Sequence, residues 1–360
     1  MIGWWRTSFG EEVVESVAKT IRKECISLGP VTGEFENRLA KSLGVPYVVA
    51  TTSGSTAILM ALMALGIKEG DEIIVPNRTW IATVHAPLML GAKVVLVDVL
   101  SDIPIIDVAQ IRKKITSRTK AIIPVPLNGR AVNMDEIWKI AKEYRLHVIE
   151  DASQALFSKY SGKQAGKYMG TQSDAGCFSL SIAKLVPTGQ GGFVVTKNKI
   201  TYEKLKRLRM HGLDNVINCT FDHMGFNFRF TDVLASIGLV QLDRAPQRIL
   251  QHKKIYSKYE DGIKGLSFLE MIPVDIAKDE VPIYVEVLCK NRDRLVSFFA
   301  AHQIQTRPFY PGLNKAKYLK ASGKFPNADV FAKHGLFLPC GPDQSFENID
   351  RVIKALRLFK

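Results

Sequence analysis

Apolar stretches alternate with helical patterns between about residue 45 and residue 200, and this alternation limits the possible folds more than any other feature. The pattern is typical of a mostly parallel sheet with crossover helices. Seven strands are expected, at 48–50, 72–75, 93–97, 121–125, 147–150, 176–180 and 193–196. Helices are expected at 55–65, 83–90 and 134–144, with Gly66 as a candidate cap after the first.

The pattern changes after about residue 240. A long polar helix, 244–264, leads to short strands within 281–288 and to further helices. We therefore expect a large α/β domain, residues 1–240, and a smaller C-terminal α+β domain, residues 241–360. The large domain should include an N-terminal helical segment, with an amphipathic stretch from Glu11 to Ile26 and a second helix opening at Gly33.

Charge and composition exclude several classes of protein. The net charge is +14, from 49 Lys+Arg and 35 Asp+Glu, which is compatible with a solvated basic surface, a phosphorylated substrate or nucleic acid. The basic residues are spread along the chain without a recognition motif, so we expect no nucleic-acid partner. No apolar run is long enough to span a membrane, and the N-terminus lacks a secretory pattern, so a cytoplasmic protein is expected. The five scattered cysteines form no CxxC pair, so neither a metal site nor a disulfide framework is expected.

Lys184 stands between an acidic strand end and a Gly-rich turn. Asp151 follows the apolar strand upstream, and Thr-Gly-Gln-Gly-Gly occupies 188–192 downstream. Ligands in open α/β sheets bind beyond the carboxyl ends of the strands. Pyridoxal phosphate (PLP) requires an amine to hold it, a carboxylate at its ring nitrogen and a cradle for its phosphate, so a Schiff base on Lys184 is suggested. The alternative for Asp151 is a helix N-cap. Its neighbour Glu150 should point to the opposite face of the sheet.

Three further segments carry possible chemistry. Ser53, Gly54 and Ser55 lie between a strand and a helix, where backbone N–H groups attract a phosphate, although a simple N-cap is an equal alternative. Ser179 precedes the lysine and is a second candidate for phosphate binding. Trp80 follows another strand and is suited either to stack on a flat ring or to lie in the core. A nucleophilic serine is disfavoured because there is no GxSxG elbow.

Taken together, these segments resemble the fold-type-I PLP enzymes, and more narrowly the DegT/DnrJ/EryC1/StrS sugar aminotransferase family. The resemblance runs from about Ser27 to Pro339 and rests on the order and spacing of its motifs. They are Gly29-Pro30, Ser53-Gly54-Ser55, Gly70-Asp71-Glu72, Thr79-Trp80, Glu150-Asp151-Ala152-Ser153-Gln154, Asp174-Ala175-Gly176-Cys177-Phe178-Ser179 before Lys184, Gly189-Gln190-Gly191-Gly192 and Gly225-Phe226-Asn227-Phe228-Arg229.

The resemblance implies a role for each site residue. Lys184 would form the Schiff base and move protons, and Asp151 would pair with the pyridine nitrogen. Asn227 would reach the phosphate of the neighbouring subunit, so a homodimer with shared active sites is implied. Arg229 and Tyr310 are candidates for substrate contact. The implied cofactor-binding residues are Ser53, Gly54, Ser55, Trp80, Asp151, Gln154, Ser179, Lys184 and Asn227.

The implied function is a PLP-dependent aminotransferase that transfers an amino group, with glutamate as donor, to a nucleotide-linked keto-sugar through pyridoxamine phosphate (PMP). A related sugar dehydratase carries histidine in place of the lysine, so Lys184 argues against that alternative. A non-catalytic regulatory protein with the same fold is disfavoured by the intact set of Lys184, Asp151 and Trp80. Segment 125–129 departs from the family, which often has His or Tyr there, and the sequence assigns neither the nucleotide nor the sugar.

Overall fold

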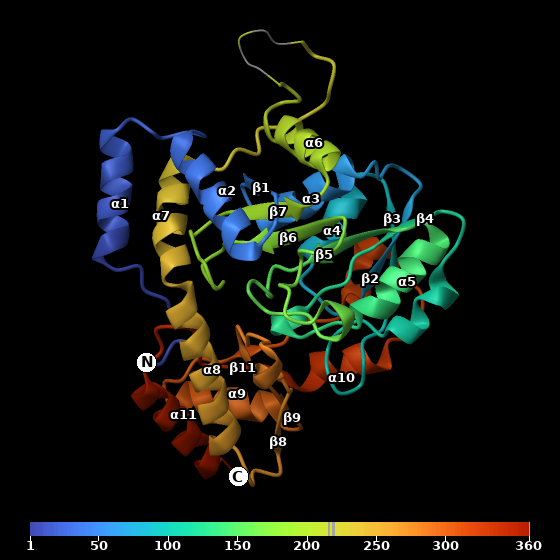
Figure 1. Cartoon of the computed structure of the whole chain (residues 1–360). Helices are drawn as coiled ribbons and strands as arrows, with labels where there is room; N and C mark the ends of the chain where they lie inside the picture. The colour runs from blue at the N-terminus through green and yellow to red at the C-terminus, as the bar shows by residue number, and fades with distance from the viewer. Residues whose placement is uncertain (215–216, 218–219, 360) are drawn as a thin grey trace.

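The computed structural model describes residues 1–214, 217 and 220–359, so Cys219 lies outside the described residues. Figure 1 shows a larger body built around a central sheet and a smaller body at its base, formed by the C-terminal part of the chain. Helix α8, Ala245–Gly262, runs from the first body into the second. Within the described part of the chain, no helix combines the length and apolar character needed to cross a bilayer.

The central sheet has seven strands in the order β1-β7-β6-β5-β4-β2-β3. Neighbouring strands are parallel except at β7, which is antiparallel to both β1 and β6. The predicted fold class, a mostly parallel seven-stranded sheet flanked by helices, is therefore confirmed. The strands are β1 Tyr47–Thr51, β2 Glu72–Pro76, β3 Lys93–Val97, β4 Thr119–Ile122, β5 His147–Asp151, β6 Ala175–Ser179 and β7 Gly192–Thr196.

Strand β4 ends three residues earlier than expected. β4 was expected to reach Val125, but it ends at Ile122. Pro124 and Pro126 follow, and proline has no N–H to donate to a strand ladder. The chain therefore leaves the sheet early and enters a turn that contains Asn128, a residue that becomes important below.

Helices lie on both sides of the central sheet (Figure 1). Besides α8, the helices of this part of the chain are α2 Pro30–Leu43, α3 Gly54–Ala64, α4 Ala82–Met89, α5 Met134–Tyr144, α6 Lys199–Arg209, α7 Asp232–Asp243 and α1 Glu11–Arg22, which packs against α7. The sequence predicted α3, α4 and α5 within one residue at each end, but not α6 or α7. Gly66 follows α3 in the left-handed conformation, with φ 81°, as a glycine after a helix end often does.

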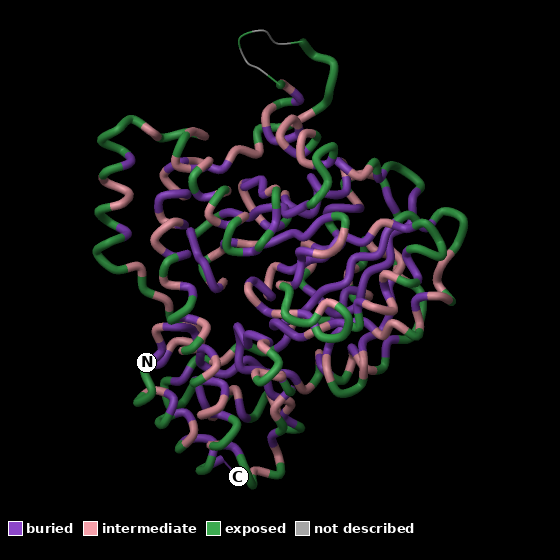
Figure 2. The backbone as a smooth tube through the Cα atoms, in the orientation of Figure 1, coloured by how far each residue is buried: buried purple, intermediate pink, exposed green. Residues whose placement is uncertain are grey.

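Helix α3 is buried almost all round, which is unusual for a helix of a soluble domain. It packs against β6 and β7 on one side and α4 on another, and most of its residues are buried (Figure 2). This environment explains why its sequence is apolar without an amphipathic period. Its N-terminal end, at Gly54, opens beside the carboxyl ends of the strands.

A four-stranded antiparallel sheet forms the core of the smaller body, in the order β10-β11-β9-β8. Ile2 and Trp5, from the other end of the chain, form isolated bridges with Ile304 and Cys340 of this body. The division at residue 240 stays a prediction. The elements of the smaller body are β8 Leu269–Met271, β9 Val285–Cys289, β10 Arg307–Pro308, β11 Gly335–Leu338, α9 Arg292–Ala301, α10 Pro326–His334 and α11 Phe346–Leu358.

The strand expected within 281–288 begins only at Val285. Two of the preceding residues donate their N–H groups to side chains of the larger body instead of to a neighbouring strand. The N–H of Val281 donates to Ser158 Oγ at 3.0 Å, and that of Tyr284 donates to Asn128 Oδ1 at 2.7 Å. Segment 281–284 is therefore a contact between the two bodies.

Helix α2 begins at Pro30, three residues before the expected start at Gly33. The cause is Asp232, the first residue of α7, whose buried carboxylate accepts hydrogen bonds from the N–H groups of Gly29, Val31 and Thr32 at 2.9, 3.2 and 2.8 Å. These are the N–H groups that a helix leaves unpaired at its start. A residue 200 positions away thus fixes the helix start.

Replacing Asp232 with alanine should therefore destabilise the protein, because several buried donors lose their acceptor. We expect a loss of about 2–4 kcal/mol in the free energy of unfolding, measured by thermal or urea unfolding. Asp243→Ala, at the other end of α7, is the control, since its exposed ion pair with Arg38 should contribute less than about 1 kcal/mol. Equal effects of the two substitutions would contradict this role of Asp232.

Candidate active site

A cavity of about 410 Å³ opens at the carboxyl ends of the central strands. This volume lies in the range of pockets that hold small-molecule ligands. The chain segments that follow β1, β2, β5 and β6 all contribute to its wall. Of the residues predicted for the site, those that line the cavity are Ser53, Gly54, Ser55, Trp80, Asp151, Gln154, Ser179, Lys184 and Tyr310.

Lys184 lies on the loop between β6 and β7. The two ends of this loop are joined by hydrogen bonds from the N–H of Leu180 to Gly191 O at 2.9 Å and from the N–H of Thr188 to Leu180 O at 2.8 Å. Within it, the N–H of Lys184 donates to Ser181 O at 3.1 Å. Gly191 has φ 139°, a backbone conformation suited to glycine. The Gly-rich sequence therefore allows a closed loop that presents the lysine to the cavity.

Burial lowers the pKa of Lys184 to about 8, and the nearby Asp151 carboxylate partly opposes this shift. Desolvation disfavours the charged ammonium, whereas a negative neighbour favours it. Because the pKa is close to neutrality, a substantial fraction of the amine is uncharged near pH 8. An uncharged amine is the form that can attack a carbonyl carbon.

Asp151 ends β5 and is buried beneath the cavity. Thr83 Oγ1 donates to its Oδ2 at 2.6 Å, and the N–H of Ser153 lies 3.3 Å from its Oδ1. The adjacent Glu150 has separate partners, accepting from Tyr160 Oη at 2.5 Å and Ser173 Oγ at 2.6 Å, and burial raises its pKa. The two carboxylates therefore have different surroundings, and only Asp151 belongs to the cavity.

The start of α3 provides a small concave surface suited to an anion. Ser53 caps the helix, since its Oγ accepts from the N–H of Thr56 at 3.1 Å, so the N-cap interpretation is correct for its side chain. The N–H groups of Gly54 and Ser55 belong to the first turn, where no intrahelical acceptor exists. A side chain at Gly54 would place its Cβ 2.9 Å from Ser179 Cβ, filling this surface. These residues fit a phosphate group.

Trp80 lies across the cavity with 49% of its surface exposed, so it is not a core residue. Its ring meets Tyr310 edge-on, with centroids 5.4 Å apart. Burial raises the pKa of Tyr310 to about 12, opposed by the nearby Arg78 guanidinium, so the phenol stays neutral at physiological pH. The Arg78 guanidinium lies 4.2 Å from the Phe309 ring centroid and donates to Tyr310 O at 3.3 Å, fixing the Tyr310 backbone.

Two predicted residues do not line this cavity. Asn227 is exposed and forms an isolated bridge with Met210. The backbone of Arg229 forms an isolated antiparallel bridge with that of Thr51. Arg229 Nε is buried without a hydrogen-bond partner among the described residues. Their roles toward a partner's phosphate and toward substrate stay predictions.

The cavity also contains residues that the sequence did not reveal. Trp4, Tyr284, Arg307 and Phe337 line it. The Arg307 guanidinium lies 5.1 Å from the Trp4 ring centroid. These residues come from the N-terminus and the smaller body, and no local motif marks them. Only the spatial return of distant segments to the cavity identifies them.

The Lys184–Asp151 interaction predicts a measurable change in lysine titration. Asp151→Asn removes the charge that favours the ammonium, so the pKa of Lys184 should fall below about 8. The pH dependence of Lys184 acetylation in cofactor-free protein, followed by mass spectrometry, would measure it. Asp350→Asn, which removes a surface carboxylate paired with Lys258, is the control and should leave the midpoint unchanged. An unchanged or higher midpoint in Asp151→Asn would contradict the interaction.

Comparisons with known proteins agree with this geometry. The chain is similar to GDP-perosamine synthase of Escherichia coli O157:H7, with 35% identity over 342 residues, covering 92% of this chain and 91% of the relative. The fold is similar to that of DesV from S. venezuelae, solved in complex with a ketimine intermediate, with a TM-score of 0.90, 30% identity and coverage of 97% and 94%.

A second solved structure is that of Spr1654 from Streptococcus pneumoniae, whose PLP form has a TM-score of 0.91, 26% identity and coverage of 97% of this chain and 96% of that chain. A PMP form of the same protein is also known. The sequence profile of the DegT/DnrJ/EryC1/StrS aminotransferase family matches residues 7–357. The match spans nearly the whole chain, so the chain belongs to the DegT/DnrJ/EryC1/StrS aminotransferase family.

Proposed function

We propose that the protein is a PLP-dependent aminotransferase that moves an amino group from glutamate to a nucleotide-linked keto-sugar. The observation that carries this proposal is the meeting, in one cavity, of the Lys184 amine, the Asp151 carboxylate and the first turn of α3. These are the three elements that PLP requires. The relative named GDP-perosamine synthase supports a nucleotide-linked sugar as the acceptor.

The chain's residues would divide the work of the reaction. PLP, when bound, supplies a ring that accepts electrons from the reacting carbon. Asp151, held by Thr83, would keep the ring nitrogen protonated. Lys184, with its pKa near 8, would hold the cofactor and carry the proton between donor and acceptor carbons. The N–H groups of Gly54 and Ser55, with Ser179 Oγ, would bind the phosphate.

The remaining residues would shape the substrate side. Trp80 would stack on the cofactor ring, and Gln154 would lie at its hydroxyl edge. Tyr310, as a neutral phenol beside Trp80, would donate a hydrogen bond to the substrate. The amine of Lys184 also separates this proposal from a dehydratase, which carries histidine at the corresponding position.

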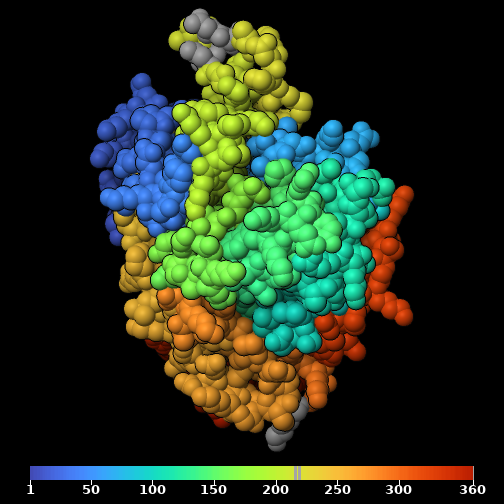
Figure 3. Space-filling model, turned by 45° about the vertical axis from the view of Figure 1, so that its right-hand side comes forward, coloured from blue at the N-terminus to red at the C-terminus, as the bar shows by residue number. Residues whose placement is uncertain are grey.

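A homodimer with shared sites forms part of the proposal. The described residues 210–214 and 220–229 form a segment that projects from the larger body beside α6 (Figures 1 and 3). Phe221 and Met224 on this segment are 88% and 69% exposed, as expected of side chains that meet a second copy. Asn227, on the same segment, would then reach the partner's phosphate site.

The covalent role of Lys184 can be tested directly. Protein purified with PLP should be yellow, and borohydride should fix the cofactor on Lys184. Peptide mapping by mass spectrometry would locate the adduct. Lys184→Ala should still bind PLP weakly through the phosphate site but lose transamination. The matched control is Lys197→Ala, an exposed lysine outside the cavity. An adduct on a different lysine would overturn the assignment.

The shared site predicts recovery of activity in mixed dimers. Lys184→Ala and Asn227→Asp should each be inactive, the second because its charge would repel the phosphate. After subunit exchange, one site of the heterodimer would contain both original residues, so part of the activity should return. Recovery would be measured as glutamate-dependent amination, with exchange confirmed by mass spectrometry of tagged chains. No recovery despite confirmed exchange would count against the shared site.

A further inference from the structure

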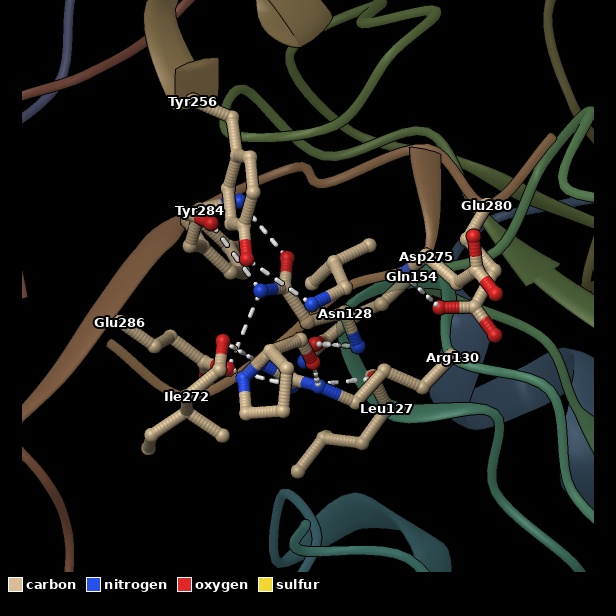
Figure 4. A network of polar contacts seen from close by, with 12 residues as sticks. Leu127, Asn128, Arg130, Gln154, Tyr256, Ile272, Asp275, Glu280, Tyr284 and Glu286 are labelled. Carbon is tan, nitrogen blue, oxygen red and sulfur yellow. Dashed lines mark hydrogen bonds and ion pairs between the residues drawn. The ribbon is translucent and has the colours of Figure 1, made fainter. Parts of the chain in front are cut away.

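A buried polar network joins the smaller body to two sides of the cavity, and Asn128 stands at its centre (Figure 4). The N–H of Asn128 donates to Gln154 Oε1 at 3.0 Å, which fixes a residue of the cavity wall. The Asn128 side chain turns the other way, toward Tyr284 and Glu286. Asn128 is fully buried and has φ 55°, a left-handed conformation that asparagine and glycine adopt more readily than most residues.

The Asn128 side chain pairs with the backbone of Tyr284 on both sides. Its Oδ1 accepts from the N–H of Tyr284 at 2.7 Å, and its Nδ2 donates to Tyr284 O at 3.0 Å. The same Nδ2 lies 3.0 Å from Glu286 Oε2. If the amide flipped, Asn128 Oδ1 would face Tyr284 O and Glu286 Oε2, and neither of these oxygens can donate a hydrogen bond. The orientation of Asn128 is therefore fixed.

An ion pair anchors this arrangement. Arg130 Nη1 lies 2.5 Å from Glu286 Oε2, and both side chains are buried. The rest of the guanidinium is also satisfied, with Nε donating to Pro273 O at 2.7 Å and Nη2 to Ile272 O at 3.0 Å. Because the buried guanidinium also donates to backbone carbonyls, this ion pair defines a specific geometry more than it adds stability.

Tyr284 links the network to the loop between β6 and β7, which carries Lys184. Its hydroxyl donates to Ala183 O at 3.1 Å, on the residue immediately before Lys184. Burial raises the pKa of Tyr284, so the hydroxyl keeps its proton. On the other side of the lysine, Arg248 Nη1 donates to Leu185 O at 3.3 Å. The two carbonyls that flank Lys184 are thus both held from outside the loop.

We propose that Tyr284 and Asn128 are positioning residues for the Lys184 loop. Tyr284 holds the loop through Ala183 O. Asn128 fixes Tyr284 relative to the carboxyl end of β5, where Asp151 and Gln154 lie. The smaller body thereby helps to set the position of the Lys184 amine. The inference rests on the proposed function in taking Lys184 as the reacting amine.

Removal of one oxygen atom tests the hydrogen bond to the loop. In full-length Tyr284→Phe, amide exchange at Lys184 and Thr188 should be about fivefold faster, as expected for one hydrogen bond. Hydrogen exchange of peptides covering 181–191, in the absence and presence of PLP, would measure it. Tyr259→Phe is the matched control, because its buried hydroxyl also donates to a backbone carbonyl, Pro339 O at 2.8 Å.

Tyr259→Phe should lower the unfolding midpoint like Tyr284→Phe but leave exchange of the loop at the wild-type rate. The rate at which Lys184 captures added PLP, trapped with borohydride, should fall several-fold in Tyr284→Phe alone. Wild-type exchange in Tyr284→Phe, or equal acceleration in Tyr259→Phe, would overturn the inference.

A double-mutant cycle tests the link between Asn128 and Tyr284. Asn128→Gly removes the side-chain hydrogen bonds but keeps the left-handed backbone, which glycine adopts freely. Asn128→Gly alone should accelerate exchange of the loop. In Tyr284→Phe it should add no further acceleration, because residues that act through one contact are not additive. If the two substitutions instead multiplied each other's effect on the exchange rate, Asn128 would not act through Tyr284.

The exchange measurement also separates this inference from the proposed function. Loop exchange in cofactor-free protein does not depend on whether PLP is the cofactor. If wild-type protein formed no borohydride-stable adduct on Lys184, the proposed function would fail even with the expected exchange rates. If the adduct formed but exchange were the same in all variants, only the positioning role would fail.

Discussion

The loop between β6 and β7 is the constraint on which the rest of the site depends. Because β6 and β7 are antiparallel, both ends of this loop lie at the same end of the two strands, and two backbone hydrogen bonds close the loop. Lys184 is therefore held in a place where burial lowers its pKa to about 8. The same strand ends place Ser179 beside the start of α3. One local piece of topology thus brings an amine and an anion-binding surface together.

The parallel part of the sheet supplies the charge that complements this amine. Asp151 can be buried at the end of β5 because Thr83 and the N–H of Ser153 satisfy its oxygens. Without such partners a buried carboxylate would be strongly disfavoured. The larger body therefore holds the acid through neutral hydrogen-bond donors, and the carboxylate lines the cavity, where a cationic group can approach it. In the proposed reaction, that group is the protonated pyridine nitrogen.

Local sequence determined much of this arrangement, and its limits have physical reasons. β3 and α5 were predicted with their observed bounds, because apolar period and capping residues are local signals. The cavity residues on strand ends followed from the same signals. The start of α2 was not predictable, since the acceptor that caps it, Asp232, lies 200 residues away. Nor could any pattern show that Tyr284 bonds Ala183, or that Trp4 returns to the cavity.

The most direct measurement follows the transferred nitrogen atom. The protein would be incubated with PLP, isotopically labelled glutamate and a panel of nucleotide-linked 3-keto and 4-keto sugars, and the products analysed by mass spectrometry. We expect at least one nucleotide-linked sugar to acquire the label in step with release of 2-oxoglutarate, and Lys184→Ala to abolish both. Release of 2-oxoglutarate without labelling of any sugar in the panel would contradict a nucleotide-linked keto-sugar as the acceptor.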